Sequence, residues 1–130
     1  MLLANEAVQL STGNPAPSGG GLTAVELGLA REAEVAVLTG GKVARQAVTV
    51  KGLGSTDIDV IGQAGEYIAV GGPAKTASAV GRQLQILQKA AEQAGVKAEA
   101  YFAKGTPESV LKVARRRLGA ENVHIFEDVK

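Results

Sequence analysis

Three acids and one lysine between positions 57 and 75 are the residues best placed to do chemistry. Asp57 and Asp59 alternate with apolar residues in a stretch with strand character, and Glu66 follows a glycine-rich turn. Strand side chains alternate between two faces, so the two aspartates share a face, and the turn brings Glu66 toward them. Mg²⁺ binds to a few carboxylates together with water and phosphate oxygens. The pattern therefore predicts that Asp57, Asp59 and Glu66 hold a divalent cation such as Mg²⁺ and act in phosphodiester hydrolysis.

Lys75 completes this candidate catalytic group. It follows Gly71-Gly72-Pro73 at the threshold of a long predicted helix, where it could orient a water or neutralise charge on a phosphate. Arg82 and Gln85 lie three positions apart on that helix and share a face. We interpret them as candidate substrate-binding residues that contact phosphate or ribose.

The composition sets limits on the class of protein. A chain of 130 residues with 45% apolar residues is sufficient for one domain with one core. The net charge of +1 gives the whole chain no electrostatic preference for nucleic acid. The absence of cysteine excludes a disulfide framework, a thiolate metal site and a cysteine nucleophile. No apolar run approaches the roughly 18 residues of a membrane span.

The N-terminal segment has the composition of a leader. Residues 11–21 are rich in glycine, proline and small polar residues, so we expect a flexible leader or linker over 1–21 and one domain over 22–130. Residues 1–10 lack the basic start and long apolar stretch of a signal peptide. If the domain is exported, we expect the signal on a larger parent chain.

The first helix is predicted by its capping residues. Thr23 and Glu26 form a capping box, and the helix should run to about Leu38 and close on Gly40-Gly41. A helix glutamate can complete a metal site, but capping already accounts for Glu26.

The remaining pattern predicts an α/β domain. Thr106 is expected to cap a helix that has Pro107 at its first position. The order α-β-β-β-α-β-α-β implies an αβββαβ-type core with a mixed central sheet flanked by helices, plus an extra C-terminal α-β unit. The expected strands are 43–50, 57–61, 66–70, 96–103 and 122–126, of which the first three form a meander, and the later helices are 76–94 and 107–118.

This order from about 22 to 126 resembles the restriction-endonuclease-like PD-(D/E)XK fold, whose core runs α-β-β-β-α-β. The segments TDIDVIG, EYIAVGGPAK and GRQLQILQKAAEQAGVKAEAYFAKGTPESVLKVARRRLGAENVHIF are similar to toxin modules at the C-termini of large bacterial exoproteins. These are the contact-dependent growth inhibition, filamentous-haemagglutinin-type and Rhs polymorphic toxins. The resemblance implies a nuclease toxin acting on RNA, most often transfer RNA, and neutralised by a cognate immunity protein. It also implies a secreted or cell-surface location as the tail of a larger exoprotein, with action in the cytoplasm of the target cell.

The usual signature of this fold is an acid at the end of the second strand followed by Glu-x-Lys on the third. Asp57 or Asp59 can serve as the first acid. The positions of the Glu and the Lys in this motif fall on Ala69 and Gly71, neither of which has a side chain that can bind a cation or supply a positive charge. The resemblance therefore requires Glu66 and Lys75 to act from shifted positions.

Two alternatives remain open. A metal-independent ribonuclease resembling the barnase, colicin and RelE toxins would use Lys75, Arg82, Thr106 and the only histidine, His124, to make a 2′-oxygen attack the adjacent phosphate. The predicted helices between strands argue against this group, and a strand histidine that faces solvent is the simpler interpretation of His124. The other alternative is a non-enzymatic protein-binding or immunity-type module, although the near-neutral charge and the leader fit a module on a larger chain better.

Overall fold

The computed structural model describes residues 21–129 and confirms the predicted α/β class. The element order matches the sequence prediction, with one short 3₁₀ turn added before the last strand. The elements are α1 (Ala24–Thr39), β1 (Lys42–Val50), β2 (Gly54–Ile61), β3 (Tyr67–Gly71), α2 (Ala77–Ala94), β4 (Ala98–Ala103), α3 (Glu108–Leu118), η1 (Ala120–Asn122) and β5 (Val123–Phe126).

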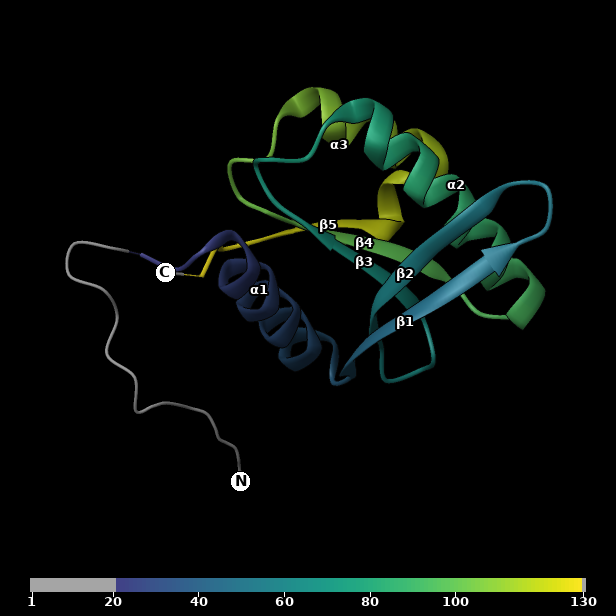
Figure 1. Cartoon of the computed structure of the whole chain (residues 1–130), viewed down its shortest axis with the longest axis horizontal. Helices are drawn as coiled ribbons and strands as arrows, with labels where there is room; N and C mark the ends of the chain where they lie inside the picture. The colour runs from purple at the N-terminus through teal and green to yellow at the C-terminus, as the bar shows by residue number, and fades with distance from the viewer. Residues whose placement is uncertain (1–20, 130) are drawn as a thin grey trace.

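The strands form one mixed sheet in the order β1-β2-β3-β4-β5 (Figure 1). β1, β2 and β3 pair antiparallel, which confirms the predicted meander, whereas β3, β4 and β5 pair parallel. Parallel neighbours require a crossover connection. The helices α2 and α3 supply these crossovers, in agreement with the helices predicted over 76–94 and 107–118.

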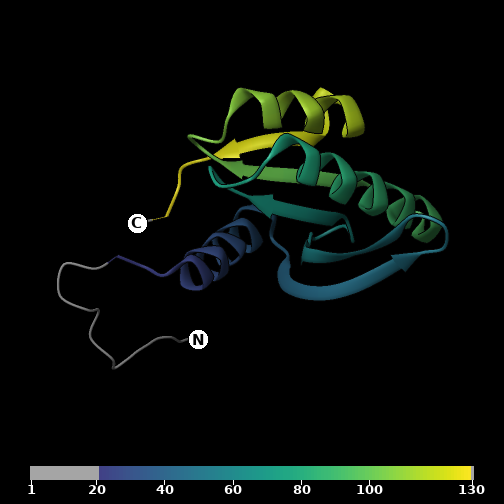
Figure 2. The ribbon, with the colours of Figure 1, turned by 45° about the horizontal axis from the view of Figure 1, so that its top comes forward.

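Helices cover both faces of the sheet (Figure 2). α1 packs on one face, where Val35 and Ala36 meet Val60, Ile68 and other apolar side chains. α2 and α3 lie together on the opposite face over the larger core. Its buried members are Ile58, Ala69, Val80, Leu84, Leu87, Ala91, Ala98, Ala100, Phe102, Val110, Leu111, Ala114 and Leu118.

Local signals at the ends of α1 hold in the structure. The Thr23 side chain accepts the N–H of Glu26, and the Glu26 side chain accepts the N–H of Thr23, so the capping box is confirmed. Gly40 closes the helix in the left-handed region at φ 67°. Glu26 is thereby occupied in capping, as its position in the sequence indicates.

The predicted role of Thr106 is wrong. Its hydroxyl donates to the carbonyl oxygen of Ala103 at 2.7 Å, and its backbone N–H donates to the same oxygen. The side chain is therefore buried in the turn after β4 instead of accepting a helix N–H. α3 begins at Glu108 without a side-chain cap.

Residues 1–20, most of the predicted leader, lie outside the described residues. Among residues 21–129, no helix has the length and hydropathy needed to cross a membrane.

Candidate active site

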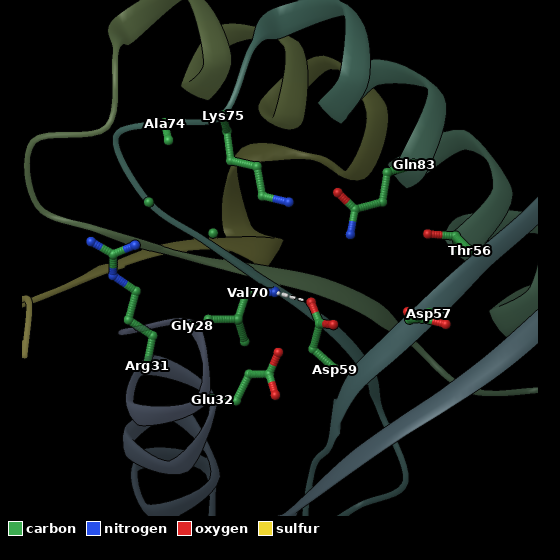
Figure 3. Close-up of a pocket in the computed structure, with 12 residues that line it drawn as sticks. Gly28, Arg31, Glu32, Thr56, Asp57, Asp59, Val70, Ala74, Lys75 and Gln83 are labelled. Atoms are coloured by element: carbon green, nitrogen blue, oxygen red, sulfur yellow. Dashed lines mark hydrogen bonds between the residues drawn. The ribbon is translucent and has the colours of Figure 1, made fainter. Parts of the chain in front are cut away.

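A cavity of about 490 Å³ lies where α1, β2, the end of β3 and the start of α2 meet (Figure 3). We call it the α1–β2 cavity. It brings carboxylates and cations from distant parts of the chain together. Its lining side chains are Arg31, Glu32, Thr56, Asp57, Asp59, Val70, Ala74, Lys75 and Gln83, with Gly28, Gly71 and Gly72.

Asp59 is positioned by an opening in the sheet. The β2–β3 ladder contains the pairs Val60–Ile68 and Ile61–Tyr67, and then the two strands separate. The Oδ2 of Asp59 accepts the backbone N–H of Val70 at 2.8 Å. Beyond the ladder, this N–H of β3 is therefore paired with the Asp59 side chain and not with the backbone of β2. Burial raises the pKa of Asp59, and the negative charge of Asp57 acts in the same direction, while the Val70 N–H and Lys75 oppose the shift.

Glu32 of α1 brings a third carboxylate to the cavity, and sequence reasoning missed it. Burial raises the pKa of Glu32, and the charges of Asp59 and Asp57 add to the effect, against Arg45 and Lys75. Its Oε1 is buried without a hydrogen-bond partner among the described residues, although the Nε of Arg45 lies 3.5 Å away. The available signal is helical spacing, because Glu32 precedes the buried Val35 and Ala36 by three and four positions and so shares their face.

The double glycine Gly71-Gly72 at the end of β3 leaves room for two cationic side chains in the cavity. A Cβ at Gly71 would lie 3.0 Å from Cγ of Lys75 and equally close to the ring of Phe102. A Cβ at Gly72 would collide with the guanidinium of Arg31. Lys75 and Arg31 therefore reach the cavity by passing over positions that have no side chain.

Two of the predicted metal ligands and the predicted lysine share this cavity, but Glu66 does not line it. The Oε1 of Glu66 accepts the N–H of Ala64 at 3.0 Å, within the β2–β3 turn. Glu66 precedes Val70 by four residues, which is about 13 Å along a strand. The turn brings Glu66 close to the end of β2, whereas the cavity lies at the other end of β3, so the predicted grouping of Asp57, Asp59 and Glu66 is corrected.

Arg82 and Gln85 do not line the cavity either. The Nη2 of Arg82 donates to the carbonyl oxygen of Leu53, in the β1–β2 turn, at 2.9 Å. The residue of this helix that lines the cavity is Gln83. Successive helix positions are rotated by about 100°, so neighbours of a cavity residue point elsewhere.

His124 lies outside the cavity, on β5. Its Nε2 is 3.0 Å from Oε1 of Glu99, and its ring stacks on Tyr101 with centroids 4.5 Å apart. The pKa of Tyr101 is raised by burial and by the charges of Glu99 and Glu66. These contacts hold the imidazole ring against β4.

The cavity residues fit a divalent cation that takes few protein ligands. Within residues 21–129, no three His, Cys, Asp or Glu side chains are grouped tightly enough to form a protein-only metal site. Mg²⁺ is usually held by one or two carboxylates, with waters and substrate phosphates completing the shell. Glu32 and Asp59 are crowded, partly buried carboxylates with raised pKa values, and a cation would relieve that crowding.

Comparison of the chain with models of known protein families, with curated proteins and with solved structures finds no significant match. No match therefore supplies a substrate or a set of site residues. A functional hypothesis depends on the fold, the cavity residues and the sequence resemblance.

Proposed function

We propose that the protein is a nuclease that hydrolyses phosphodiester bonds of RNA with the help of a divalent cation. One observation carries the proposal: carboxylates from α1 and β2 share a cavity with Lys75, which follows β3. Acids that hold a cation and a lysine that neutralises phosphate charge are a combination that can support phosphodiester hydrolysis. The αβββαβ order of the core supports the same function.

Two of the three cavity carboxylates Glu32, Asp57 and Asp59 would hold the cation, with waters and phosphate oxygens completing its shell, because no three acids among residues 21–129 are grouped tightly enough to hold it alone. When bound, Mg²⁺ neutralises phosphate charge and lowers the pKa of water. The Lys75 ammonium donates to a non-bridging oxygen of the scissile phosphate, where negative charge increases in the transition state. A cavity carboxylate that does not bind the cation, such as Asp59 with its raised pKa, is suited to accept a proton from the attacking water. Gln83 offers both a donor and an acceptor for the ribose or the water.

The biological setting is part of the proposal and is supported by the sequence resemblance. The module would be the C-terminal toxin of a larger exported protein, delivered into a target cell, with transfer RNA as its preferred substrate. A cognate immunity protein would bind it in the producing cell.

The residues of the metal-independent alternative lack a common cavity in the described part of the chain. Lys75 lines the α1–β2 cavity, but Arg82 bonds to Leu53, Thr106 is buried, and His124 pairs with Glu99. In-line attack by a 2′-oxygen requires an acid and a base close to the same phosphate.

Incubation of the purified protein with total RNA tests the proposal. We expect cleavage in Mg²⁺ that stops when EDTA is added. Cleavage that persists in EDTA would favour the metal-independent ribonuclease. RNA left intact under both conditions would favour a protein-binding module.

A further inference from the structure

Arg31 and Asp128 form a two-bond ion pair at the border of the α1–β2 cavity. The Nε of Arg31 donates to Oδ1 of Asp128, and its Nη2 donates to Oδ2, each at 2.8 Å. The Arg31 side chain is only 13% exposed and that of Asp128 28%. Such a fork between guanidinium and carboxylate fixes the plane of the arginine. The pair thus holds a rigid cation at the cavity.

The rest of the guanidinium remains available to a ligand. Arginine has five N–H donors, and Asp128 takes two of them. The Nη1 of Arg31 makes no hydrogen bond with any residue in 21–129, and it lies against Gly72, which also lines the cavity. Figure 3 shows Arg31 on one side of the cavity and Asp57 on the other, with Asp59 and Glu32 between them.

We infer that Arg31 binds a second phosphate of the polynucleotide, next to the phosphate that is cleaved, and that Asp128 is its positioning residue. This inference rests on the proposed nuclease function. A guanidinium fork matches phosphate oxygens as well as carboxylate oxygens. One edge of Arg31 is bound to Asp128, and the other edge is left for the phosphate.

The charge of the cavity favours this assignment. Three carboxylates line it, and Lys75 is the other cation among its lining residues. A polynucleotide brings one negative charge per nucleotide, so a nuclease needs cations beyond those at the scissile bond. Arg31 lies on the side away from Asp57, where a neighbouring phosphate would pass.

Asp128 makes the segment after β5 a part of this site. The N–H of Lys104 donates to the carbonyl oxygen of Phe126 at 2.8 Å, which ties the end of β5 to the chain after β4. Two residues later, Asp128 meets Arg31 of α1. A purely structural pair that ties this segment to α1 would require the same contacts, so the test must measure phosphate binding itself.

The test is the salt dependence of binding to a single-stranded RNA oligonucleotide in EDTA, followed by fluorescence anisotropy. For single strands, each phosphate contact contributes about 0.7 to the slope of log K against log salt. We expect Arg31→Gln to lower the slope by about that amount and to weaken binding about 10-fold or more. Asp128→Asn should weaken binding but keep the slope, because the positive charge of Arg31 remains.

Arg115→Gln is the matched control. Arg115 lies on α3 and pairs with Glu108 at 2.9 Å, so this variant loses the same charge and a similar ion pair outside the cavity. We expect it to keep both the slope and the affinity. If Arg31→Gln fails to fold, Arg31→Lys replaces it, with the slope kept and the affinity reduced because lysine has no fork.

The outcomes separate this inference from the proposed function. If the wild type binds and cleaves RNA but Arg31→Gln keeps the wild-type slope and affinity, the pair only tethers the chain after β5 and the inference is overturned. The same holds if Arg31→Lys keeps the wild-type affinity. If the wild type neither binds nor cleaves RNA, the nuclease function itself is overturned.

Discussion

The carboxylate of Asp59 accepts the backbone N–H of Val70 at the point where β2 and β3 separate. This contact gives a mostly buried acid a fixed orientation, with Oδ2 bound to the chain. It also satisfies a donor that the opened sheet would otherwise leave without a partner. The break in the sheet and the position of the acid therefore depend on each other.

Replacing Asp57 or Lys75 with alanine should abolish activity with little effect on stability. Asp57 is exposed and Lys75 partly exposed, so each change should alter the unfolding free energy by about 0.5 kcal/mol or less. Loss of one preorganised electrostatic group lowers a rate about 10²- to 10³-fold. Growth inhibition on expression in bacteria, together with thermal melting, measures both effects. Full toxicity in both variants would exclude this site, and Lys112→Ala on α3 is the control.

The pH dependence of Glu32→Gln tests the cost of burying Glu32 beside Asp59 and Asp57. The pKa of Glu32 is raised above its ordinary value of 4.5. At pH values between the unfolded and the folded pKa, the folded state therefore keeps a proton on Glu32 that the unfolded state has lost. The contribution of Glu32 to stability is therefore greatest below that ordinary pKa and is lost as pH rises through the folded pKa. Glu32→Gln should melt higher than the wild type at neutral pH and equally at pH values below 4.5. A lower melting temperature at neutral pH would contradict this account.

Mg²⁺ should stabilise the folded protein through the same acids. A ligand at a hundredfold excess over its Kd adds about 2.7 kcal/mol to the free energy of unfolding. We expect the melting temperature to rise with Mg²⁺ for the wild type and to rise much less for Asp57→Asn. Ca²⁺ and Mn²⁺ titrations give the selectivity. An equal rise in both proteins would place the cation outside the cavity.

Gly72→Ala should act through Arg31. Gly72 does not occupy the left-handed backbone region, so alanine brings no strain of its own, but its Cβ would collide with the guanidinium. We expect Gly72→Ala to weaken RNA binding as Arg31→Gln does, and the double variant to be no weaker than Arg31→Gln alone. If the losses of RNA affinity in the two single variants add up in the double variant, Gly72 acts independently of Arg31 and this prediction is wrong.

His124→Asn should retain cleavage. The imidazole, on β5, is held by Glu99 and Tyr101 of β4, away from the cavity. The single-turnover rate on RNA measures the effect, and Glu99→Gln is the companion variant. A loss of several hundredfold in His124→Asn would instead support the ribonuclease that uses a histidine.

Much of the fold could be predicted because its signals are local. The Thr23–Glu26 box and the left-handed glycines at 40 and 95 end their helices where the sequence indicates. The prediction for Thr106 failed because a hydroxyl before proline can bond backward as well as forward. Here the hydroxyl donates to the carbonyl oxygen of Ala103 instead.

The site could be predicted only in part, because register and packing decide it. Alternation was enough to place Asp57 and Asp59 together. The sequence predicts that Glu66 joins Asp57 and Asp59 because the hairpin turn brings it close to β2. The cavity, however, opens at the far end of β3, and Glu66 bonds within the turn. The position of Glu32 in the cavity depends on how α1 packs across the sheet, which no local sequence pattern specifies.

Single-turnover cleavage of transfer RNA across a Mg²⁺ titration tests the central claim most directly. The wild type is compared with Glu32→Gln, Asp57→Asn and the matched variant Glu66→Gln. The account predicts that the first two variants lose at least about 10²-fold in rate, while Glu66→Gln cleaves as the wild type does. Full activity in Glu32→Gln and Asp57→Asn, or a loss confined to Glu66→Gln, would contradict it.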